Sequence, residues 1–471
     1  MPVLPLIAAL LLLSLPVAAP AQADAEPSPE QLAAEALAHA ELLVAKGSHA
    51  AALKEYRITA RKWPDTEAGR VAEERTRPTT FFGWSDILRH GPSANRVDVV
   101  VMGDGYDIKK QGEFDDIAKT LPRLFDHNKT LGEYQRHFNF LRANLISAEN
   151  GIDGLGREYD TALGGFIRGT IQGHVGVDRR LVRQMLEFVP EHDGFAVVYV
   201  KRGEHGTGGG GVAVIGGRND PTTIHEWGHA FANLGDEYTT TTHERGDVAQ
   251  RPNISDTDDP ERVPWKHWLE ADVKGLGIYE GADGRVKGAW KARAASCLME
   301  HGQFFCYVCR EAVVLRIHEF VDPIDAWTPQ PGGAWLDSGR DDGAALVVEP
   351  GPWVFAVRVM QPMTHDLEVR WWVLPAAEAP AEPTPGARAT GTRLDRGPLA
   401  SLDVEPTNRS RGDNSGVHEF ELDPADLEPG RYVVLCRAWD DTDVKGDRYP
   451  WVLRDASGLL QSERRWHLQV R

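Results

Sequence analysis

The chain has 471 residues and a formal net charge of −18 at pH 7. Hydrophobic residues make up 41% of it, which is enough to bury cores in about two to four domains. The acidic balance argues against a nucleic-acid partner, because neutralising phosphates requires a basic face and the sequence contains no basic patch.

The N-terminal segment MPVLPLIAALLLLSLPVAAPAQADAE contains an apolar run followed by Ala21-Gln22-Ala23, a small-x-small cleavage pattern. We therefore predict a signal peptide over residues 1–23, and a secreted or periplasmic protein. No Lys or Arg precedes the apolar run, which departs from an ordinary signal peptide. A membrane anchor fits less well because Pro16 and Pro20 break the run, and no other segment is predicted to span a membrane.

Residues 28–80 are predicted to form a helical hairpin that resembles one tetratricopeptide unit. Apolar residues recur at helical spacing on both sides of a break at Gly47, and Pro64 lies near the start of a further helix. A single unit of this kind cannot bury its own apolar face well. We therefore expect these helices to dock on the rest of the chain or on a protein partner.

From Arg96 the pattern changes to alternating strands and helices. VDVVVMGDGY, FNFLRANLIS and FAVVYVKRG are apolar runs typical of buried strands, and GEFDDIAKTLPRLFD has helical spacing. The glycine-rich stretch HGTGGGGVAVIGG lacks the Gly-Lys-Ser/Thr of a phosphate-binding loop, so we interpret it as a mobile loop that leads to an edge strand. These patterns predict an α/β domain over residues 90–325.

The segment TTIHEWGHAFANLGDEY, residues 222–238, contains the His-Glu-x-x-His pattern of zinc peptidases. Asp220 and Pro221 are typical of a helix start, and on a helix His225 and His229 present two imidazoles on one face. Zinc lowers the pKa of bound water to about 7, so Glu226 can take its proton as a general base. The alternative is an amphipathic helix with two surface histidines.

The same segment predicts an early end to this helix. Asn233 tolerates the left-handed conformation that ends helices, and Gly235 eases a turn. A continued helix would carry Asp236 about 10 Å along the axis from His229, too far to share an ion. We expect a break at Asn233 that brings Asp236 back to the metal, with Glu237 as the alternative third ligand.

From residue 326 the sequence predicts an all-β sandwich. VFAVRVMQ, LEVRWWVL, HEFELD, RYVVLCRAWD and WHLQVR are short runs separated by Pro, Gly and Asp clusters, a texture typical of immunoglobulin-like folds. Residues 376–391 read as an exposed loop, and the Arg-Gly-Asp tripeptide at 411–413 as a turn in a polar loop rather than an adhesion motif.

The chain contains four cysteines, three of which lie close together in the sequence. In an exported protein we expect a disulfide among Cys297, Cys306 and Cys309, whose pairing the spacing leaves open. The alternative is a second zinc site, but only three thiols lie locally. Cys436 lies in a predicted strand and is expected to be a buried small hydrophobe.

HEWGHAFANLGDEY resembles the active-site segment of the IgA-peptidase family of secreted zinc metallopeptidases, which are metzincins. The resemblance extends to VDVVVMGDGY, to SCLMEHGQFFCYVCREAV and to YPWVLRDASGLLQ. It implies a metzincin-like α/β catalytic domain with one catalytic Zn²⁺ held by His225, His229 and Asp236. It also implies Glu226 as general base and Met299 in a methionine turn beneath the metal.

Three features depart from that family. Asn233 stands where the family often has Gly, and the N-terminal helices replace an expected β-domain. The general metzincin spacing would put Gly at Ala232 and the last ligand at Gly235, so Asp236 comes one residue late.

Together these patterns predict a secreted zinc endopeptidase with a protein or peptide substrate. Its catalytic domain is expected between the helical hairpin at 28–80 and the β-sandwich at 326–471, either of which offers a surface to a protein partner. The alternative is a catalytically idle adhesion or binding module built on a metallopeptidase scaffold. The intact metal-binding pattern favours the enzyme, because decay would remove one of its residues.

Overall fold

The structure is a computed structural model, and the chain divides into two compact units, Met1–Thr76 and Arg77–Arg471. The predicted signal peptide and most of the Arg-Gly-Asp tripeptide lie outside the described residues. In the described part of the chain, no helix is long and apolar enough to cross a bilayer. The described residues are 27–46, 49–76, 81–154, 156–168, 173–218, 220–241, 247–329, 336–337, 346–347, 351–381, 399–411 and 416–471.

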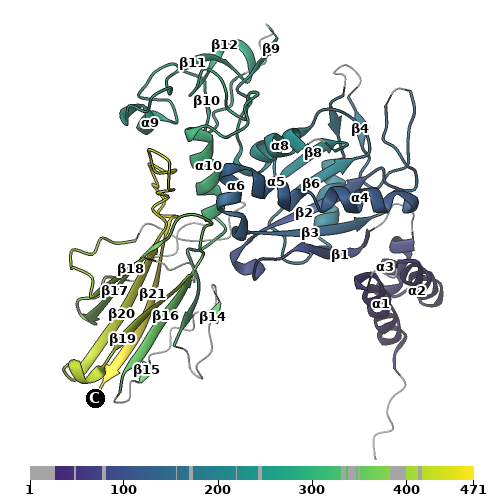
Figure 1. Cartoon of the computed structure of the whole chain (residues 1–471). Coiled ribbons are helices and arrows are strands. Elements are labelled where there is room, and N and C mark those ends of the chain that lie inside the picture. The colour runs from purple at the N-terminus through teal and green to yellow at the C-terminus, as the bar shows by residue number, and fades with distance from the viewer. Residues whose placement is uncertain are drawn as a thin grey trace, which may run out of the picture. The chain divides into compact units, whose positions relative to one another are not determined.

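In its described residues, the first unit contains three helices, α1 (Pro29–Ala45), α2 (His49–Lys62) and α3 (Glu67–Thr76) (Figure 1). α1 begins with a capping box, in which the Ser28 hydroxyl accepts from the Gln31 amide and the Gln31 side chain accepts from the Ser28 amide. Small buried residues such as Ala33, Ala40 and Ala52 allow the helices to pack closely. The third helix follows Pro64, so this unit is larger than a hairpin.

The second unit is built on a six-stranded sheet in the order β1-β3-β2-β6-β8-β7 (Figure 1). The four central strands are parallel, and the edge strands β1 and β7 are antiparallel to their neighbours. The sheet thus begins upstream of residue 90, where we expected the domain to start. The strands are β1 (Phe81–Leu88), β2 (Val97–Asp104), β3 (Phe138–Leu145), β6 (Phe195–Val200), β7 (Thr207–Gly209) and β8 (Val212–Gly216).

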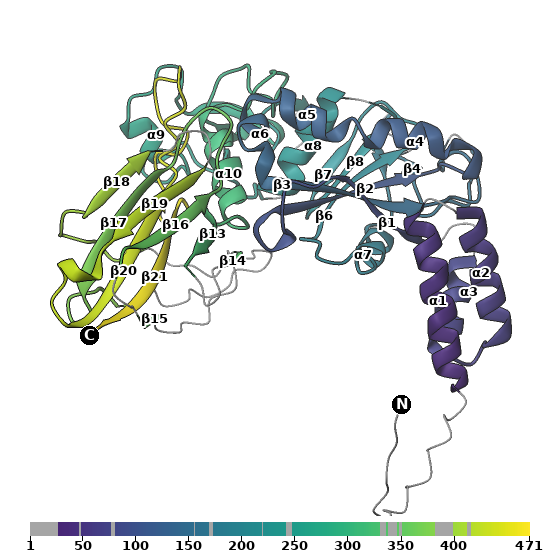
Figure 2. The same ribbon diagram turned by 60° about the horizontal axis from the view of Figure 1, so that its bottom comes forward.

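Helices cover both faces of this sheet (Figure 2). Because successive strand residues point to opposite faces, Val99 and Val101 of β2 belong to one core while Val100 and Met102 belong to another. α7 (Arg179–Leu186) packs on the second core. The first core is shared with α4 (Gln111–Ala118), α5 (Leu121–His127), α6 (Lys129–Glu133), α8 (Asp220–Ala232) and α10 (Tyr307–His318).

Two small sheets flank the main one. The first has the order β10-β12-β11, with β9 pairing in parallel with β12. The second pairs β4 (Phe166–Ile167) with β5 (Val175–Gly176). The elements between α8 and α10 are β9 (Thr239–Thr241), β10 (Ile254–Ser255), α9 (Lys266–Glu270), β11 (Tyr279–Ala282) and β12 (Gly284–Lys291).

The C-terminal part contains two sheets that share one core, in the orders β14-β13-β16-β19 and β15-β21-β20-β17-β18. Trp371 and Trp466 stack in this core with ring centroids 5.7 Å apart, and Cys436 is buried beside them. Its strands are β13 (Ile324–Thr328), β14 (Leu336–Asp337), β15 (Leu346–Val347), β16 (Trp353–Val359), β17 (Glu368–Pro375), β18 (Asn408–Arg411), β19 (Val417–Leu422), β20 (Gly430–Trp439) and β21 (Gln461–Val470).

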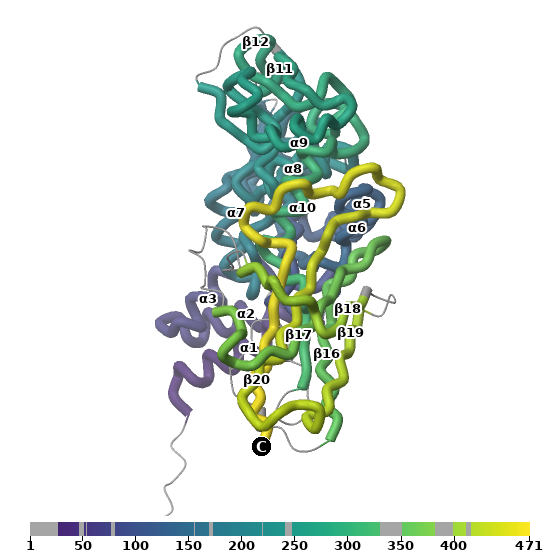
Figure 3. Tube along the Cα trace, turned by 90° about the vertical axis from the view of Figure 1, so that its left-hand side faces the viewer, coloured from purple at the N-terminus to yellow at the C-terminus, as the bar shows by residue number. Residues whose placement is uncertain are grey.

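The connection between β20 and β21 packs against the α/β part of the same unit. Figure 3 shows this segment in yellow, running past α10. Trp451 and Val452 from the connection are buried in the core of the main sheet, and the Leu453 amide donates to Glu311 of α10 over 2.8 Å. The β-rich part and the α/β part of the second unit are therefore joined by apolar and polar contacts.

Candidate metal centre

The helix α8 carries the His-Glu-x-x-His pattern directly after strand β8. Trp227 and Phe231 on one face of the helix stack with ring centroids 5.0 Å apart and are buried in the core beside the sheet. This packing fixes the rotation of the helix about its own axis. His225 and His229 consequently lie on the face that lines a cleft.

Three electron-pair donors converge at this cleft. The Nε2 atoms of His225 and His229 are 3.0 Å apart, and Asp236 Oδ1 lies 3.1 Å from the first and 3.0 Å from the second. Burial alone would raise the pKa of Asp236, but its hydrogen bonds to the two histidines hold that pKa well below the usual range. Atoms with these separations can act as neighbouring ligands of one small cation, whose bonds to them would be about 2 Å long.

Backbone carbonyls orient both imidazoles. His225 Nδ1 lies 3.0 Å from the carbonyl oxygen of Leu298, and His229 Nδ1 lies 2.6 Å from that of Leu234. A carbonyl can only accept, so each Nδ1 donates its proton to a carbonyl oxygen. A bound metal ion would take the place of any proton on the two Nε2 atoms, and the neutral rings would then be in the tautomer that a metal ligand requires.

The chain reverses after α8 at the residue expected to end the helix. The helix stops at Ala232, and Asn233 has the left-handed φ of 51°. Gly235 follows where a Cβ would lie only 2.4 Å from Ile254 Cγ1, so a side chain has no room. The reversal returns Asp236 to the two histidines.

Asn253 holds this turn, and sequence reasoning missed it. Its side chain accepts from the Gly235 amide over 2.7 Å and donates to the Gly235 carbonyl over 2.9 Å. The same amide group donates to Glu237 Oε1 over 2.9 Å. Asn253 is fully buried but lies in an irregular segment, where no hydrophobic period or motif marks it.

Glu237, the alternative third ligand, points away from the histidines. It is fully buried, its amide donates to the Met299 carbonyl over 2.8 Å, and its Oε1 lies 3.1 Å from Cys309 Sγ. Burial, with the charge of Cys306 as a further cause, raises the pKa of Glu237 to about 7. The structure therefore separates the two adjacent carboxylates into two clusters.

Met299 lies against α8, where the resemblance places a methionine turn. It is fully buried, and a Cβ built on Gly228 would lie 2.9 Å from its Sδ. The preceding residue Leu298 supplies the carbonyl that orients His225. This turn thus contacts the helix and one of its histidines at once.

The predicted local disulfide is not formed in the structure. Each of the four cysteines is a free, buried thiol. Cys297 Sγ and Cys309 Sγ are 3.6 Å apart, against about 2.05 Å for a disulfide bond. The three local thiols nevertheless lie in one cluster with Glu237.

The glycine-rich stretch forms the edge strand β7 itself and packs directly on the motif. A Cβ on Gly208 would lie 2.4 Å from the Glu226 carbonyl oxygen and 2.7 Å from His229 Cβ, and one on Gly206 would lie 2.5 Å from Glu226 Cγ. Glycines are needed here because the strand backbone contacts the helix. Glu226 is buried beneath the strand, and burial raises its pKa to about 7.

A cleft of about 1500 Å³ contains the whole constellation. Its lining includes His225, Glu226, His229, Asp236 and the strand β7. A second cavity of about 820 Å³ touches only His229 among these residues, so the larger cleft is the one in which a substrate can meet all of them.

Comparison with known proteins adds an independent finding. The model of the IgA peptidase M64 family matches residues 86–275, a range that contains α8, the turn after it and most of the main sheet. No curated protein matches the chain.

Proposed function

Because the model of the IgA peptidase M64 family matches residues 86–275, we propose that this chain is a zinc-dependent endopeptidase of that family. The observation that carries the proposal is the convergence of His225, His229 and Asp236 in a cleft that also contains Glu226. The early helix stop and the position of Met299 further support a metzincin-like arrangement.

The donor set suits zinc. His225 and His229 would each bind through Nε2, and Asp236 would bind through a carboxylate oxygen, which are ordinary zinc ligands in catalytic sites. When bound, the ion would polarise the scissile carbonyl and make a water molecule more acidic. The Leu298 and Leu234 carbonyls would keep the two imidazoles in place, because each accepts a hydrogen bond from the opposite ring nitrogen.

Glu226 is proposed as the general base. It follows the first ligand on the helix and lines the same cleft, so its carboxylate can take a proton from the attacking water. The same carboxyl group can then give that proton to the leaving amine nitrogen. Burial beneath β7 limits competing contacts with bulk water.

The edge strand β7 supports an extended peptide as the substrate. β7 is the last strand in the described order of the main sheet, and its glycines line the cleft next to Glu226. An extended peptide can pair with such an edge through main-chain hydrogen bonds. The lining of this cleft of about 1500 Å³ also includes His174, Tyr238 and His301, and a cleft of this volume favours a peptide segment of several residues as the substrate.

The signal-peptide pattern at residues 1–23 supports a proposed site of action outside the cytoplasm. A mature chain that acts there would meet extracellular or periplasmic proteins as substrates.

A quenched-fluorescent peptide library tests the proposed activity. The purified chain should cleave members of the library, lose this activity in a zinc chelator and regain it when zinc is restored. Absence of chelator-sensitive cleavage, in protein shown to be folded, would favour the idle adhesion or binding module instead.

A further inference from the structure

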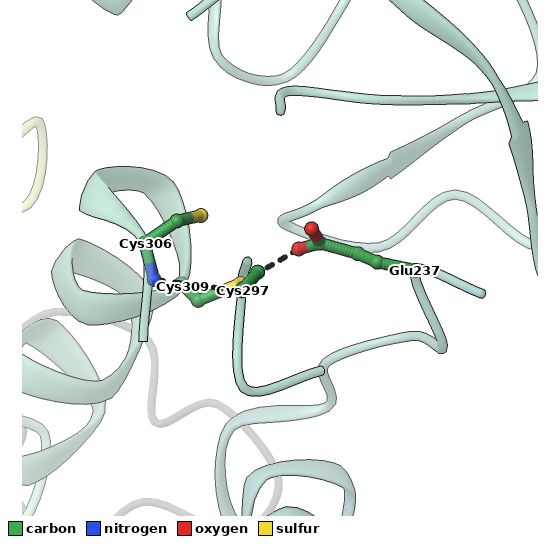
Figure 4. A group of neighbouring side chains, drawn as sticks. All are labelled: Glu237, Cys297, Cys306 and Cys309. Carbon is green, nitrogen blue, oxygen red and sulfur yellow. Dashed lines mark hydrogen bonds between the residues drawn. The ribbon is translucent and has the colours of Figure 1, made fainter. Parts of the chain in front are cut away.

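A second group of potential metal ligands lies next to the proposed catalytic centre. Glu237, Cys297, Cys306 and Cys309 each offer one donor atom, and these four atoms all lie within 4.8 Å of one another (Figure 4). The residues come from three separate places: the turn after α8, the turn that contains Met299, and the first turn of α10. Sequence spacing brings only the cysteines together; the fold adds the carboxylate.

We propose that these four residues bind a second zinc ion, which has a structural role. This site goes beyond the proposed peptidase activity, since none of its residues belongs to the catalytic constellation.

The distances favour a shared ion over a disulfide. Cys297 Sγ and Cys309 Sγ are 3.6 Å apart, and Cys309 Sγ lies 3.1 Å from Glu237 Oε1. Zinc–sulfur bonds of about 2.3 Å in a tetrahedron place neighbouring sulfurs about 3.8 Å apart. The Cys297–Cys309 pair is close to this spacing, and all four donor atoms lie within 4.8 Å of one another. A disulfide would use two of the three thiols and leave the third beside a buried carboxylate.

Burying these polar side chains costs free energy unless each of them has an interaction partner. Cys297, Cys309 and Glu237 are fully buried and Cys306 is 3% exposed. Glu237 Oε2 has no hydrogen-bond partner among the described residues, although it is completely enclosed. An unpaired buried carboxylate oxygen is costly, and a divalent cation at the centre of the cluster would satisfy it.

The surroundings suit thiolates and a closed site. Cys306 is the N-cap of α10, where the helix dipole favours negative charge, and the Cys306 amide lies 3.4 Å from Cys297 Sγ. Lys291 is buried nearby; its ammonium donates to the Glu237 carbonyl and to Glu300. Four enclosed protein donors leave no position for substrate, which is the character of a structural zinc site.

An ion here would support the catalytic centre indirectly. It would fix Glu237, which adjoins Asp236, and Cys297, which adjoins the Leu298 that orients His225. It would also tie both turns to α10. The second zinc would therefore hold in place two of the backbone segments that position the first.

Metal analysis of the full-length protein tests this proposal. The wild type should contain about two zinc ions per chain, and both Cys309→Ser and Glu237→Gln should contain about one. Cys436→Ser is the matched control, because this cysteine is buried in the separate core of the β-rich part and should leave the content unchanged. His225→Ala should lose the histidine-bound ion and keep the thiolate-bound ion. The variants therefore show separately whether the proposed catalytic site and the proposed structural site bind zinc.

A second measurement needs no cysteine variant and covers the case in which Cys309→Ser does not fold. Replacing zinc with Co²⁺ should give intense thiolate-to-cobalt charge-transfer absorption in the wild type and in His225→Ala alike. Absence of this absorption in folded, cobalt-loaded protein would overturn the proposal. Mass spectrometry of the alkylated chain that shows two of the three cysteines joined as a disulfide would also overturn the proposal. A zinc content that Cys309→Ser does not lower would overturn it as well.

Discussion

Asp236 and Glu237 are consecutive in the chain, yet their carboxylates belong to two different clusters. Asp236 Oδ1 lies 3.0 Å from His229 Nε2, whereas Glu237 Oε1 lies 3.1 Å from Cys309 Sγ. The left-handed Asn233 and the hydrogen bonds of Asn253 set the turn that separates them. This single turn therefore supplies the Asp236 carboxylate to the proposed catalytic ion and the Glu237 carboxylate to the proposed structural ion.

Substitutions of these two residues should have different effects. Asp236→Ala should abolish peptide cleavage and remove the histidine-bound zinc, because the ion loses its third ligand. It should keep the cobalt–thiolate absorption. Glu237→Gln should weaken that absorption and keep the histidine-bound ion. Zinc content and cobalt spectra of both variants check this; the reverse pattern would exchange the roles of the two carboxylates.

Glu226→Gln should keep the fold and the full zinc content but lower kcat by about 100- to 10,000-fold, the range expected when a general base is lost. Peptide cleavage rates and zinc content of the purified variant test this. Glu187→Gln is the control, since Glu187 is exposed and caps α7 outside the cleft. Activity near the wild-type level in zinc-loaded Glu226→Gln would assign the proton transfer to another residue.

Gly208→Ala should impair both activity and stability. Its Cβ would lie 2.4 Å from the backbone oxygen of Glu226, so either β7 or α8 must shift. Overpacking of this kind destabilises proteins by about 1–3 kcal/mol. Chemical denaturation and cleavage assays measure the two effects.

Gly112→Ala is the matched control for that substitution. Gly112 lies in α4, and a Cβ there would have no heavy atom within 4 Å. Alanine in a helix is favoured over glycine by about 1 kcal/mol, so this variant should be neutral or slightly more stable. Equal stability and equal cleavage activity of Gly208→Ala and Gly112→Ala would show that the contact between β7 and α8 is not tight.

Alkaline pH should weaken the junction between the two parts of the second unit. His365 is buried with Nδ1 2.8 Å from Glu133 of α6 and Nε2 2.8 Å from Asp440 after β20. Burial alone would lower the pKa of His365, but its hydrogen bonds to Asp440 and Glu133 outweigh this and raise it to about 9. The folded protein therefore holds this proton more tightly than the unfolded chain does.

A raised folded-state pKa stabilises the protein fully below the unfolded value of 6.5, and this contribution is lost as pH rises to about 9. The loss is of the order of 3 kcal/mol, since one pKa unit corresponds to about 1.4 kcal/mol. Denaturation of the wild type and of His365→Gln across this range tests it. The variant should lack this decline; parallel pH profiles for the two proteins would contradict the prediction.

Local chemistry explains what the sequence could predict. The continuous apolar run of β2 indicated a buried strand, and it occupies the middle of the main sheet. Asn233 and Gly235 indicated where α8 ends, because left-handed backbone and a tight turn each favour particular residues. The spacing of His225 and His229 needed only a helix to bring them together.

Contacts between distant segments were beyond local reasoning. Glu237 is distant from the cysteines in the sequence and comes close to them only in the folded chain. The sequence therefore indicates the three neighbouring thiols but not the carboxylate that is the fourth donor. The glycine-rich stretch predicts a loop before an edge strand, whereas its residues Thr207–Gly209 themselves form the edge strand β7. The packing of this strand on Glu226 comes from tertiary structure, which a local pattern does not indicate. Asn253 and the network around His365 depend equally on residues far apart in the chain.

Anomalous X-ray diffraction at the zinc absorption edge, from crystals of protein purified without chelators, tests whether His225, His229 and Asp236 hold a zinc ion. We expect an anomalous peak about 2 Å from His225 Nε2, His229 Nε2 and a carboxylate oxygen of Asp236. A zinc-replete crystal with no peak among these three atoms, or with Glu237 in the place of Asp236, would contradict it.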